Sequence, residues 1–453
     1  MIQRTLKEVQ TMLNGTGLKA ESELIGIKGV TTDSRQVQPK NLFFPLVGEN
    51  FNGHQFARKA LELGATAIVW DINEENPPEN IPVIFVEDTL KALQQLAKAY
   101  REQVDVKVVG VTGSNGKTTT KDMISSVLAT TFSVHKTKGN FNNHIGLPLT
   151  LLSMSEETEI AVLEMGMSGK GEIQLLSEIA QPDAAVITNI GESHLLDLGS
   201  REGIAEAKLE IVAGLKEKGY FTYFGDEPLL QDRLKSFQFL TKTFGEQSQN
   251  DYFPTSITQE SNGTSFILKN NHYFIPVLGK HNVYNALAAY SIGQYFGVND
   301  EAIKKGLQEI EITGMRLELL KSEDDISIIN DAYNASPTSM IAAIQLLEDL
   351  KGYKQKIVVL GDMLELGDQE ILFHQQVGKT ILEQEISHVL TYGKLGAEIA
   401  KGAKENLPEE RVHHFVDKSE LIQRVKEVAK AGDIILVKAS RGMKLEEVVN
   451  VFI

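Results

Sequence analysis

The chain of 453 residues contains no cysteine, and this absence removes several classes of chemistry. Disulfide bonds, thiolate nucleophiles and cysteine-ligated zinc or iron–sulfur centres are excluded, so any catalysis must use oxygen and nitrogen groups. Long apolar runs are also missing, because runs such as Ile81 to Val86 are far shorter than the roughly 20 residues that cross a bilayer. The first residues show no apolar signal-peptide core. We therefore expect a cytoplasmic protein with no membrane partner.

Positive charge is scarce, since 45 Lys and Arg residues stand against 61 Asp and Glu residues, a net charge of −16. Such an acidic surface repels phosphate backbones, so we expect no nucleic acid partner, and any anionic ligand must be held by a local site. Hydrophobic residues make up 42% and charged residues 23%, as in ordinary globular proteins. At about 150 residues per domain, this length predicts about three domains.

The strand and helix patterns divide the chain into three α/β segments. The first is a small α/β unit that opens with a helical stripe from Ile2 to Leu13. The second alternates strands with helices, which predicts a parallel sheet, and it carries an antiparallel hairpin joined at Asn270 and Asn271. The third is a second alternating series, typical of a doubly wound, Rossmann-like domain. The predicted domains are residues 1–102, 103–313 and 314–453.

A glycine-rich loop follows a buried strand over residues 106–112 and precedes a helical pattern. Glycines let backbone N–H groups face a phosphate, Lys117 can reach the terminal phosphates and Thr118 can hold Mg²⁺. The match to the strict phosphate-loop pattern is incomplete, because Val111 replaces its first glycine, and a plain turn with a solvated lysine is the alternative. The flanking strand and helix favour a nucleoside triphosphate site. The loop residues are Gly113, Ser114, Asn115, Gly116, Lys117, Thr118 and Thr119.

Polar residues follow two further strands of this segment, where ligands of an open parallel sheet bind. Glu164 ends one strand and His194 lies just beyond another, so both are candidate ligands for Mg²⁺ ions that neutralise a transferring phosphoryl group. A strand-end cap for Glu164 and a plain loop histidine are the alternatives. Lys208 lies in a helical pattern between two glutamates, where most lysines are solvated.

Several further motifs, in this order and spacing, resemble those of the Mur ligase family. The resemblance covers nearly the whole chain. Besides the phosphate loop, it rests on TTDSR at 31–35, KTKGNFNNHIGLP at 136–148, LEMGMS at 163–168, ITNIGESHLLDLGSREGIAEAK at 187–208, GKHNVYNALAA at 279–289, TGMRLE at 313–318, NDAYNASPTSM at 330–340, GDMLELG at 361–367 and VKASRGMK at 437–444.

This resemblance implies a three-domain ligase. Its N-terminal domain would bind a UDP-linked substrate, its central domain ATP, and its C-terminal domain would close over ATP, about a hinge near Gly314, and bring the amine. The implied catalytic residues are Lys117, His194 and Lys208, and the metal ligands, for two Mg²⁺ ions, are Thr118, Glu164, His194 and Lys208 as a carbamate. Outside the phosphate loop, the implied ATP contacts are Asn282, Asn285, Arg316 and Asp331. The implied substrate contacts are Asp33, Ser34, Arg35, Asn142, Asn143, Asn334, Lys438, Ser440 and Arg441.

The motifs GDMLELG and NDAYNASP also imply the substrates. They resemble the member that adds D-alanyl-D-alanine to UDP-N-acetylmuramoyl-tripeptide (UDP-MurNAc-tripeptide) through an acyl phosphate, and that mechanism requires only a monomer. Two alternatives stay open, namely the family member that adds the third amino acid, whose Asp-Asn-Pro-Arg motif is absent here, and a phosphate-loop kinase.

Overall fold

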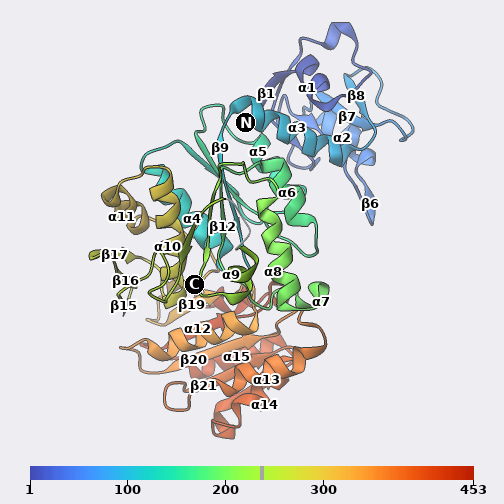
Figure 1. Ribbon diagram of the computed structural model, residues 1–453. Coiled ribbons are helices and arrows are strands. Elements are labelled where there is room, and N and C mark those ends of the chain that lie inside the picture. Colours follow the sequence, from blue (N-terminus) through green and yellow to red (C-terminus); the bar gives the residue numbers. More distant parts are fainter. Residues whose placement is uncertain (235–238) are drawn as a thin grey trace.

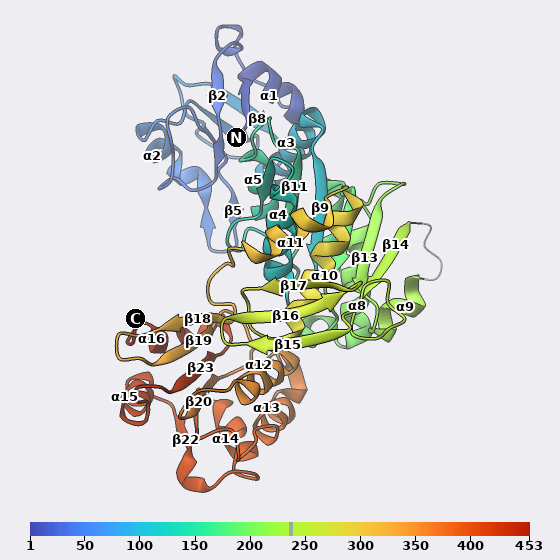
Figure 2. The ribbon, with the colours of Figure 1, turned by 90° about the vertical axis from the view of Figure 1, so that its left-hand side faces the viewer.

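The computed structural model describes residues 1–234 and 239–453, which form three α/β domains along one axis (Figures 1 and 2). Each domain has its own parallel sheet, and this confirms the predicted fold class. The N-terminal domain lies at one end, the C-terminal domain at the other, and the central domain between them. Within the described ranges, no helix combines the length and the apolar character that a bilayer crossing requires.

The N-terminal domain is built on a parallel sheet of four short strands in the order β3-β4-β7-β8. Its elements are β1 Gln3–Thr5, α1 Leu6–Leu13, η1 Ala20–Ser22, β2 Gly26–Lys28, β3 Val30–Thr31, β4 Leu42–Phe43, β5 Val47–Gly48, β6 Phe51–Asn52, η2 Gly53–Phe56, α2 Ala57–Glu62, β7 Ala67–Asp71, β8 Val83–Val86 and α3 Thr89–Val104. The predicted stripe was wrong at its start. Ile2 is buried but precedes strand β1, and the helix begins at Leu6, because Thr5 and Glu8 form a capping box there.

The central domain contains a six-stranded parallel sheet in the order β10-β11-β9-β12-β13-β14. Its strands are β9 Lys107–Thr112, β10 Val134–Lys136, β11 Ile160–Glu164, β12 Ala184–Ile187, β13 Tyr220–Phe224 and β14 Leu240–Phe244. Its helices are α4 Lys117–Ala129, α5 Gly146–Leu152, α6 Glu172–Ala180, α7 Leu195–Leu198, α8 Arg201–Leu209, η3 Glu210–Val212, α9 Pro228–Leu234, α10 Lys280–Tyr295 and α11 Asp300–Gln308. The strand order changes direction at β9, because β11 and β10 lie on one side of it and β12, β13 and β14 on the other. A crevice therefore opens beyond the carboxyl end of β9.

The predicted antiparallel hairpin is present, but it is larger and its turn lies elsewhere. It belongs to a three-stranded sheet of β15 Ser256–Glu260, β16 Gly263–Leu268 and β17 Asn271–Ile275. Leu268 pairs with Asn271, so the two-residue turn is Lys269 and Asn270 rather than Asn270 and Asn271. Both turn residues have positive φ, as the tight turns of right-twisted hairpins require.

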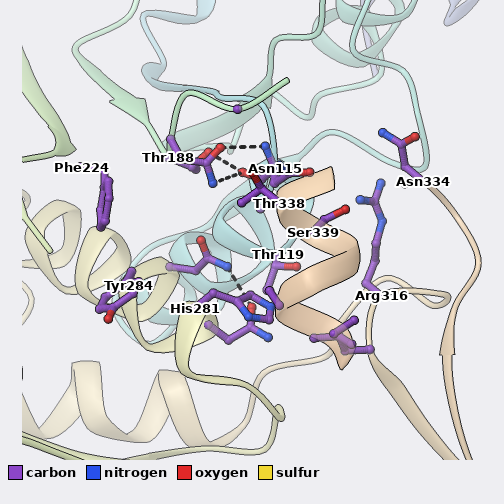
Figure 3. Close-up of a pocket in the computed structure, with 18 of the residues that line it drawn as sticks. Asn115, Thr119, Thr188, Phe224, His281, Tyr284, Arg316, Asn334, Thr338 and Ser339 are labelled. Atoms are coloured by element: carbon purple, nitrogen blue, oxygen red, sulfur yellow. Dashed lines mark hydrogen bonds between the residues drawn. The ribbon is translucent and has the colours of Figure 1, made fainter. Parts of the chain in front are cut away.

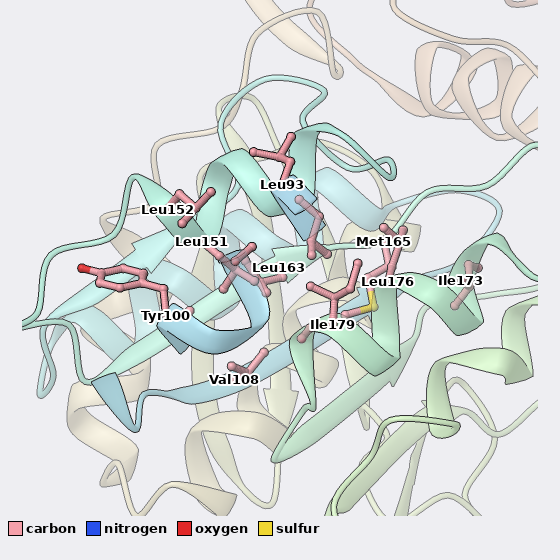
Figure 4. Packing of buried hydrophobic residues seen from close by; sticks show 14 of the residues in the cluster. Leu93, Tyr100, Val108, Leu151, Leu152, Leu163, Met165, Ile173, Leu176 and Ile179 are labelled. Atoms are coloured by element: carbon pink, nitrogen blue, oxygen red, sulfur yellow. The ribbon is translucent and has the colours of Figure 1, made fainter. Parts of the chain in front are cut away.

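Alternate residues of β9 pack into different cores, because both faces of the central sheet are covered. Val109 and Val111 face α4, α10 and α11, whereas Val108 faces α3, α5 and α6. The core around Val108 is continuous with that of the N-terminal domain. Leu93 and Tyr100 of α3 pack in it beside Leu151 and Leu163 (Figure 4). The N-terminal and central domains therefore share one hydrophobic core.

The C-terminal domain is a doubly wound sheet in the order β18-β19-β23-β20-β21-β22, parallel except for the edge strand β18. Its strands are β18 Glu318–Lys321, β19 Ser327–Asp331, β20 Lys356–Gly361, β21 His388–Tyr392, β22 Val412–Phe415 and β23 Ile434–Lys438. Its helices are α12 Pro337–Asp349, η4 Gly367–Gln369, α13 Glu370–Lys379, α14 Gly396–Ala403, η5 Glu409–Arg411, α15 Lys418–Val428, η6 Arg441–Met443 and α16 Glu446–Val449.

A short linker joins the central and C-terminal domains, and its first part is held by a buried carboxylate. Asp122 of α4 accepts hydrogen bonds from the backbone N and the hydroxyl of Thr313, at 3.0 and 2.8 Å. The same carboxylate lies 2.7 Å from Lys136 Nζ and 3.3 Å from Lys121 Nζ. Thr313 is therefore fixed to the central domain, and free rotation of the linker can begin only after it, at Gly314.

Candidate active site

A cavity of about 440 Å³ lies where the carboxyl ends of the central and C-terminal sheets face each other. The central domain contributes Asn115 and Gly116, and the C-terminal domain contributes Arg316, Asp331 and Lys438. Helix α12 passes close to the glycine-rich loop, so Thr338 and Ser339 line the same space (Figure 3). We call this space the central cavity.

The glycine-rich loop has a backbone that side chains would obstruct at two points. Gly113 has φ +150°, and an added Cβ would lie 1.8 Å from Thr188 Oγ1. Gly116 has φ +79°, and its Cβ would lie 2.7 Å from Asn285 Oδ1. Only glycine tolerates both the conformation and the close approach. The predicted loop therefore forms a tight strand-to-helix turn, and α4 begins directly after it at Lys117.

The segment after β12 supports this loop from one side. Asn115 N donates to Asn189 Oδ1 at 2.9 Å, and Thr188 Oγ1 donates to Asn115 O at 2.6 Å. Gly191 N donates to Ser114 Oγ at 2.8 Å. These bonds fix the loop before any ligand binds, which reduces the entropy cost of binding.

Lys117 bends back over its own loop. Its Nζ donates to Gly113 O at 2.8 Å, so the ammonium lies above the carbonyls of the turn. Burial lowers the pKa of Lys117, the nearby Glu164 carboxylate opposes this shift, and the Arg316 charge adds to it. A half-buried cation beside a helix N-terminus is suited to bind the terminal phosphates of a nucleotide.

Glu164 and Thr118 meet at the carboxyl end of β11. Thr118 Oγ1 donates to Glu164 Oε2 at 2.9 Å, and Asn142 Nδ2 donates to Glu164 Oε1 at 2.8 Å. Glu164 is buried, with 2% of its surface exposed. The predicted pair of Thr118 and Glu164 is thus brought together, and Asn142 joins it from the loop before α5.

His194 and Lys208 lie near Lys117 but have different surroundings. His194 Nδ1 is 2.8 Å from Glu365 Oε2 of the C-terminal domain. Lys208 is buried, with 1% exposed, and among residues 1–234 and 239–453 no hydrogen-bond acceptor or carboxylate partner contacts its ammonium. Burial, and then the charge of Lys117, bring the pKa of Lys208 well below its ordinary value. Burial also lowers the pKa of His194, against the effect of Glu365.

The donor set can hold a divalent cation only together with ligand oxygens. Among the described residues no cluster of three His, Asp or Glu side chains is arranged around one metal position. Each Glu164 oxygen accepts one hydrogen bond, which leaves a lone pair on each for a cation. With the Thr118 hydroxyl this is an oxygen-rich edge that fits Mg²⁺, provided that phosphate and water oxygens complete its shell.

Helix α10 contributes the polar floor of the central cavity. Asn285 Nδ2 donates to Asn282 Oδ1 at 2.8 Å, and Thr120 Oγ1 of α4 donates to Asn285 Oδ1 at 3.1 Å. The aromatic rings of Phe224 and Tyr284, 5.5 Å apart between centroids, form an apolar end beside them (Figure 3). A flat heterocyclic base fits such a wall.

The C-terminal domain brings its charged residues on the linker and on β19 and β23. The Arg316 guanidinium lies 4.1 Å from the centroid of the Tyr333 ring, and its buried Nε has no hydrogen-bond partner among the described residues. Lys438 Nζ lies 2.5 Å from Asp331 Oδ2 and donates to Asn334 O at 3.0 Å. All four predicted residues, Arg316, Asp331, Asn334 and Lys438, line the central cavity.

Ser440 and Arg441 do not line this cavity and have local partners instead. Ser440 Oγ accepts from Leu364 N at 2.9 Å. Arg441 Nη1 lies 2.6 Å from Glu446, and its side chain is 53% exposed. These two contacts stabilise the loop after β23, so their predicted substrate roles would require the loop to rearrange.

A second cavity, of about 620 Å³, lies between the N-terminal and central domains, and we call it the junction cavity. Asp33 and Asn143 line it, as do the ammonium-bearing side chains of Lys136 and Lys138, which our sequence analysis did not single out. Arg35 instead donates to the Asp33 carboxylate at 2.8 and 2.9 Å and lowers the pKa of Asp33 to about 2. Ser34 is buried beside them. Asn143 also caps α5 through Gly146 N, at 2.8 Å.

Other lining residues of the central cavity were also missed by sequence analysis. Thr188, Asn189 and Arg201 lie in the motif at 187–208 and His281 lies in the motif at 279–289, although none of them was singled out, whereas Phe224 ends the apolar strand β13. The sequence could have identified Thr188 and Asn189 as site residues, since they directly follow a buried strand of the same sheet, where ligands bind.

Models of known protein families match most of this chain. The chain matches the Mur ligase family, catalytic domain, over residues 26–101, the Mur ligase middle domain over 111–293, and the Mur ligase, glutamate ligase domain over 315–441. The chain belongs to the Mur ligase family. The resemblance inferred from the motifs is therefore confirmed.

Individual Mur ligases are similar over the full length. The UDP-N-acetylmuramoyl-tripeptide--D-alanyl-D-alanine ligase of Bacillus subtilis is 59% identical over 452 residues, covering 99% of this chain and 98% of that protein. The enzyme of the same name from Escherichia coli is 36% identical over 99% of this chain and 98% of its own length. Two solved structures are also similar. MurF from Acinetobacter baumannii is 31% identical with a TM-score of 0.89, covering 100% of this chain and 99% of its own. MurF ligase from Thermotoga maritima in complex with ADP is 29% identical with a TM-score of 0.83, covering 94% and 97%.

Proposed function

We propose that this Mur ligase joins D-alanyl-D-alanine to the terminal carboxylate of UDP-MurNAc-tripeptide and converts ATP to ADP and phosphate. The reaction would be a cytoplasmic step of peptidoglycan precursor synthesis, carried out by a monomer. The observation that carries the proposal is the central cavity, where Asn115 and Gly116 of the glycine-rich loop face Arg316 and Asp331 of another domain. Lys117 and Thr118 follow directly in the same loop, and Thr118 donates to Glu164. The 59% identity to the Bacillus subtilis enzyme supports the choice of substrates.

The division of labour among domains is part of this proposal. Residues 1–102 would bind the UDP-linked substrate at the junction cavity, where Lys138 offers a cation to a pyrophosphate and Lys136 is already paired with Asp122. Residues 103–313 would bind ATP, with the base between Asn282 and the aromatic end of the central cavity. Residues 314–453 would close over ATP and bring the dipeptide. Each of the three ranges matched by the family falls inside one of these domains.

The first chemical step activates an acid. A carboxylate oxygen of the tripeptide would attack the γ-phosphorus of ATP, the bond to ADP would break, and an acyl phosphate would form. Lys117 and Arg316 are the cations that would spread the charge of this in-line transfer. Thr118 and Glu164 would hold Mg²⁺, which lowers the charge of the transferring phosphoryl group.

The second step forms the amide. The free amine of D-alanyl-D-alanine would attack the acyl carbon and lose a proton, and inorganic phosphate would leave. Water competes for an acyl phosphate, so the site must be covered during this step. Contacts between Thr338 and Glu192, at 2.7 Å, and between Ser336 and Asn115, at 3.3 Å, already bring the C-terminal domain against the phosphate loop.

We further propose that Lys208 is carbamylated. A lysine with its pKa lowered is partly neutral, and only the neutral amine reacts with carbon dioxide. The product would carry a negative charge and two oxygens into a region whose nearby charges include Lys117. Such a group would complete the oxygen ligands beside Glu164, together with His194.

A phosphate-release assay tests the proposal. With ATP, UDP-MurNAc-tripeptide and D-alanyl-D-alanine, phosphate release should require all three, and mass spectrometry should find the tripeptide extended by the dipeptide minus one water. Lys117→Ala should lower the rate at least about 1,000-fold, because it removes a charge from the transition state. Lys170→Ala, at an exposed lysine paired with Glu206, is the matched control.

Other outcomes of the assay would identify the alternatives. A phosphorylated product that accumulates without the dipeptide would indicate a kinase. Turnover with UDP-MurNAc-dipeptide and a single amino acid would indicate the ligase for the third residue. ATP binding without turnover would rule out all three activities.

A further inference from the structure

One contact between the central and C-terminal domains involves a proposed active-site residue directly. His194 follows β12, and Glu365 lies in the loop after β20 of the other domain. His194 Nδ1 and Glu365 Oε2 are 2.8 Å apart, with 23% of the histidine side chain and 55% of the glutamate side chain exposed. Their angles are not those of a hydrogen bond, so the buried Nδ1 has no hydrogen-bond partner among the described residues and Glu365 is the carboxylate placed to become one. Helix α7, which begins after His194, lies against the C-terminal domain in Figure 1.

The backbones on both sides are shaped for this contact. Leu196 N donates to Glu365 O at 3.2 Å, so main chain and side chain of Glu365 both engage the segment that carries His194. His194 and Glu365 each have φ +64°, a conformation that residues other than glycine adopt at a cost. Strained backbone at two residues that face each other across a domain boundary indicates a functional constraint.

We infer that Glu365 is a positioning residue for His194, supplied by the C-terminal domain only when the two domains are docked. This inference rests on the proposed function. A carboxylate on Nδ1 fixes the orientation of an imidazole ring and keeps the proton on that nitrogen, so Nε2 presents a lone pair. Glu365 would therefore make His194 a competent ligand at the moment when the site is covered.

The surrounding charges explain why a carboxylate is needed at this position. Lys117 and Lys208 act on His194 from the central domain, and Asp197 and Glu365 are the acids that act on it. Of these two acids, Glu365 is the one in contact with Nδ1. Separation of the domains would leave the ring beside two cations without that contact.

The consequence is a link between domain docking and chemistry. In an undocked molecule His194 would be free to rotate, the ligand set around Glu164 would be incomplete, and phosphoryl transfer would be slow. Acyl phosphate would then form mainly when the C-terminal domain already excludes water. Glu365 thus protects the intermediate without contacting it.

The test compares Glu365→Gln and Glu365→Ala with Asp368→Asn. Asp368 is an exposed acid in the same loop with no hydrogen bond or ion pair to any described residue, so its variant removes the same charge without touching His194. We expect both Glu365 variants to bind Mn²⁺ in the presence of ADP about 10-fold more weakly in electron paramagnetic resonance titrations. Their kcat should fall by about 10- to 100-fold, with KM for ATP and for the UDP-linked substrate within about twofold. Asp368→Asn should match the unmodified chain in all of these.

A double-mutant cycle with His194→Ala separates positioning from a general effect on docking. In that background Glu365→Gln should change kcat and Mn²⁺ affinity by less than about twofold, because the group that it positions is gone. Unchanged Mn²⁺ affinity and kcat in Glu365→Gln would overturn the inference, and so would an equally large loss in the His194→Ala background. Melting temperatures of the variants verify folding. If the unmodified chain makes no amide, the proposed function fails, while the Mn²⁺ arm of the cycle still tests Glu365.

Discussion

At the scale of single residues, the proposed site depends on where on a strand each acid stands. Glu164 ends β11 at the carboxyl side, with hydrogen bonds from Thr118 and Asn142. Glu159 precedes the same strand at its amino side and accepts from Ser133 N at 2.7 Å. The same residue type thus has a site role at one end and a structural role at the other.

This difference predicts opposite outcomes for one substitution. Glu164→Gln should lower the phosphate-release rate about 100-fold, because a neutral amide holds a divalent cation more weakly than a carboxylate and cannot balance the charge of Lys117. Its melting temperature should change by no more than about 2 °C, since the shape is kept. Glu159→Gln should leave the rate within about twofold. Equal phosphate-release rates for the two variants would show that Glu164 has no role in the reaction.

His281 predicts a pH dependence of stability. Burial lowers its pKa to about 4, although the nearby Asp331 charge opposes this. Between the unfolded pKa of about 6.5 and the folded value, only the unfolded chain binds the proton. The stabilisation is therefore complete above pH 6.5 and is lost as pH falls toward 4, by up to about 3 kcal/mol. His281→Gln should lose less stability between pH 7.5 and 4.5 in urea unfolding, and an identical loss would contradict this.

Sequence reasoning found the residues of the site that follow strands or form the glycine-rich loop. Lys117, Thr118 and Glu164 are predictable because their chemistry and their position in a local pattern agree. Glu365 and Asp122 were not found as interaction sites. Their partners, His194 and Thr313, lie far away in the sequence, and no local pattern encodes a contact that forms only when two elements dock.

At the scale of elements, helix α4 packs directly against two other helices of the central domain. It contacts α10 and α11 over one face, and Ser126 Oγ donates to Gly306 O of α11 at 2.7 Å. An added Cβ at Gly306 would lie 2.6 Å from Val127 Cα. The glycine therefore sets the distance between two helices.

We predict that Gly306→Ala destabilises the central domain by about 1–3 kcal/mol, because the helices must separate. Urea unfolding followed by circular dichroism measures this. Gly26→Ala is the control, since a Cβ there meets no neighbouring atom. Equal midpoints for the two variants would show that α4 and α11 adapt without cost.

Strand prediction succeeded for the inner strands and for the edge strands β8 and β22, and failed at several other edges. The inner strands β9, β12, β20 and β23 were all anticipated as apolar runs. Edge strands β10, β14 and β18 were missed, because one side of each has no partner strand within residues 1–234 and 239–453 and their sequences are mixed in polarity. Their pairing depends on the neighbouring strand rather than on their own pattern.

At the scale of the whole molecule, the two outer domains are attached differently. The N-terminal domain shares a large hydrophobic core with the central domain, whereas the C-terminal domain has two cores, to which the central domain adds Leu278, and a short linker. Asp122 fixes Thr313, so rotation is confined to the residues that follow, where Met315 and Leu317 both have positive φ. Motion is therefore expected at one junction and not at the other.

Asp122→Ala should extend the flexible part of the linker. It removes the acceptor of both Thr313 hydrogen bonds and leaves Lys121, which is 1% exposed, without its carboxylate. We expect a loss of about 3–5 kcal/mol in unfolding free energy and a larger radius of gyration by small-angle X-ray scattering. A variant as compact and as stable as the unmodified chain would show that the linker is fixed elsewhere.

The absence of cysteine allows a direct test of domain opening. Glu192 Oε2 and Thr338 Oγ1 lie 2.7 Å apart across the domain boundary, so Glu192→Cys with Thr338→Cys places two thiols within reach of a short bis-maleimide cross-linker. The cross-linked double variant should release phosphate at least about 10-fold more slowly than the untreated double variant, because product release requires opening. The two single variants should be unaffected by the cross-linker. Full activity in the cross-linked state would exclude the hinge.

The shared core between the first two domains has a further consequence. Since the junction cavity and the glycine-rich loop both sit on this rigid unit, the span between them stays constant while the third domain swings. A nucleotide-linked acceptor anchored in the first cavity must present its far end at the second. The fixed distance would thus select acceptors by length. Acceptors with too few amino acids in their peptide would bind well, but their carboxylate would not reach the reacting phosphate.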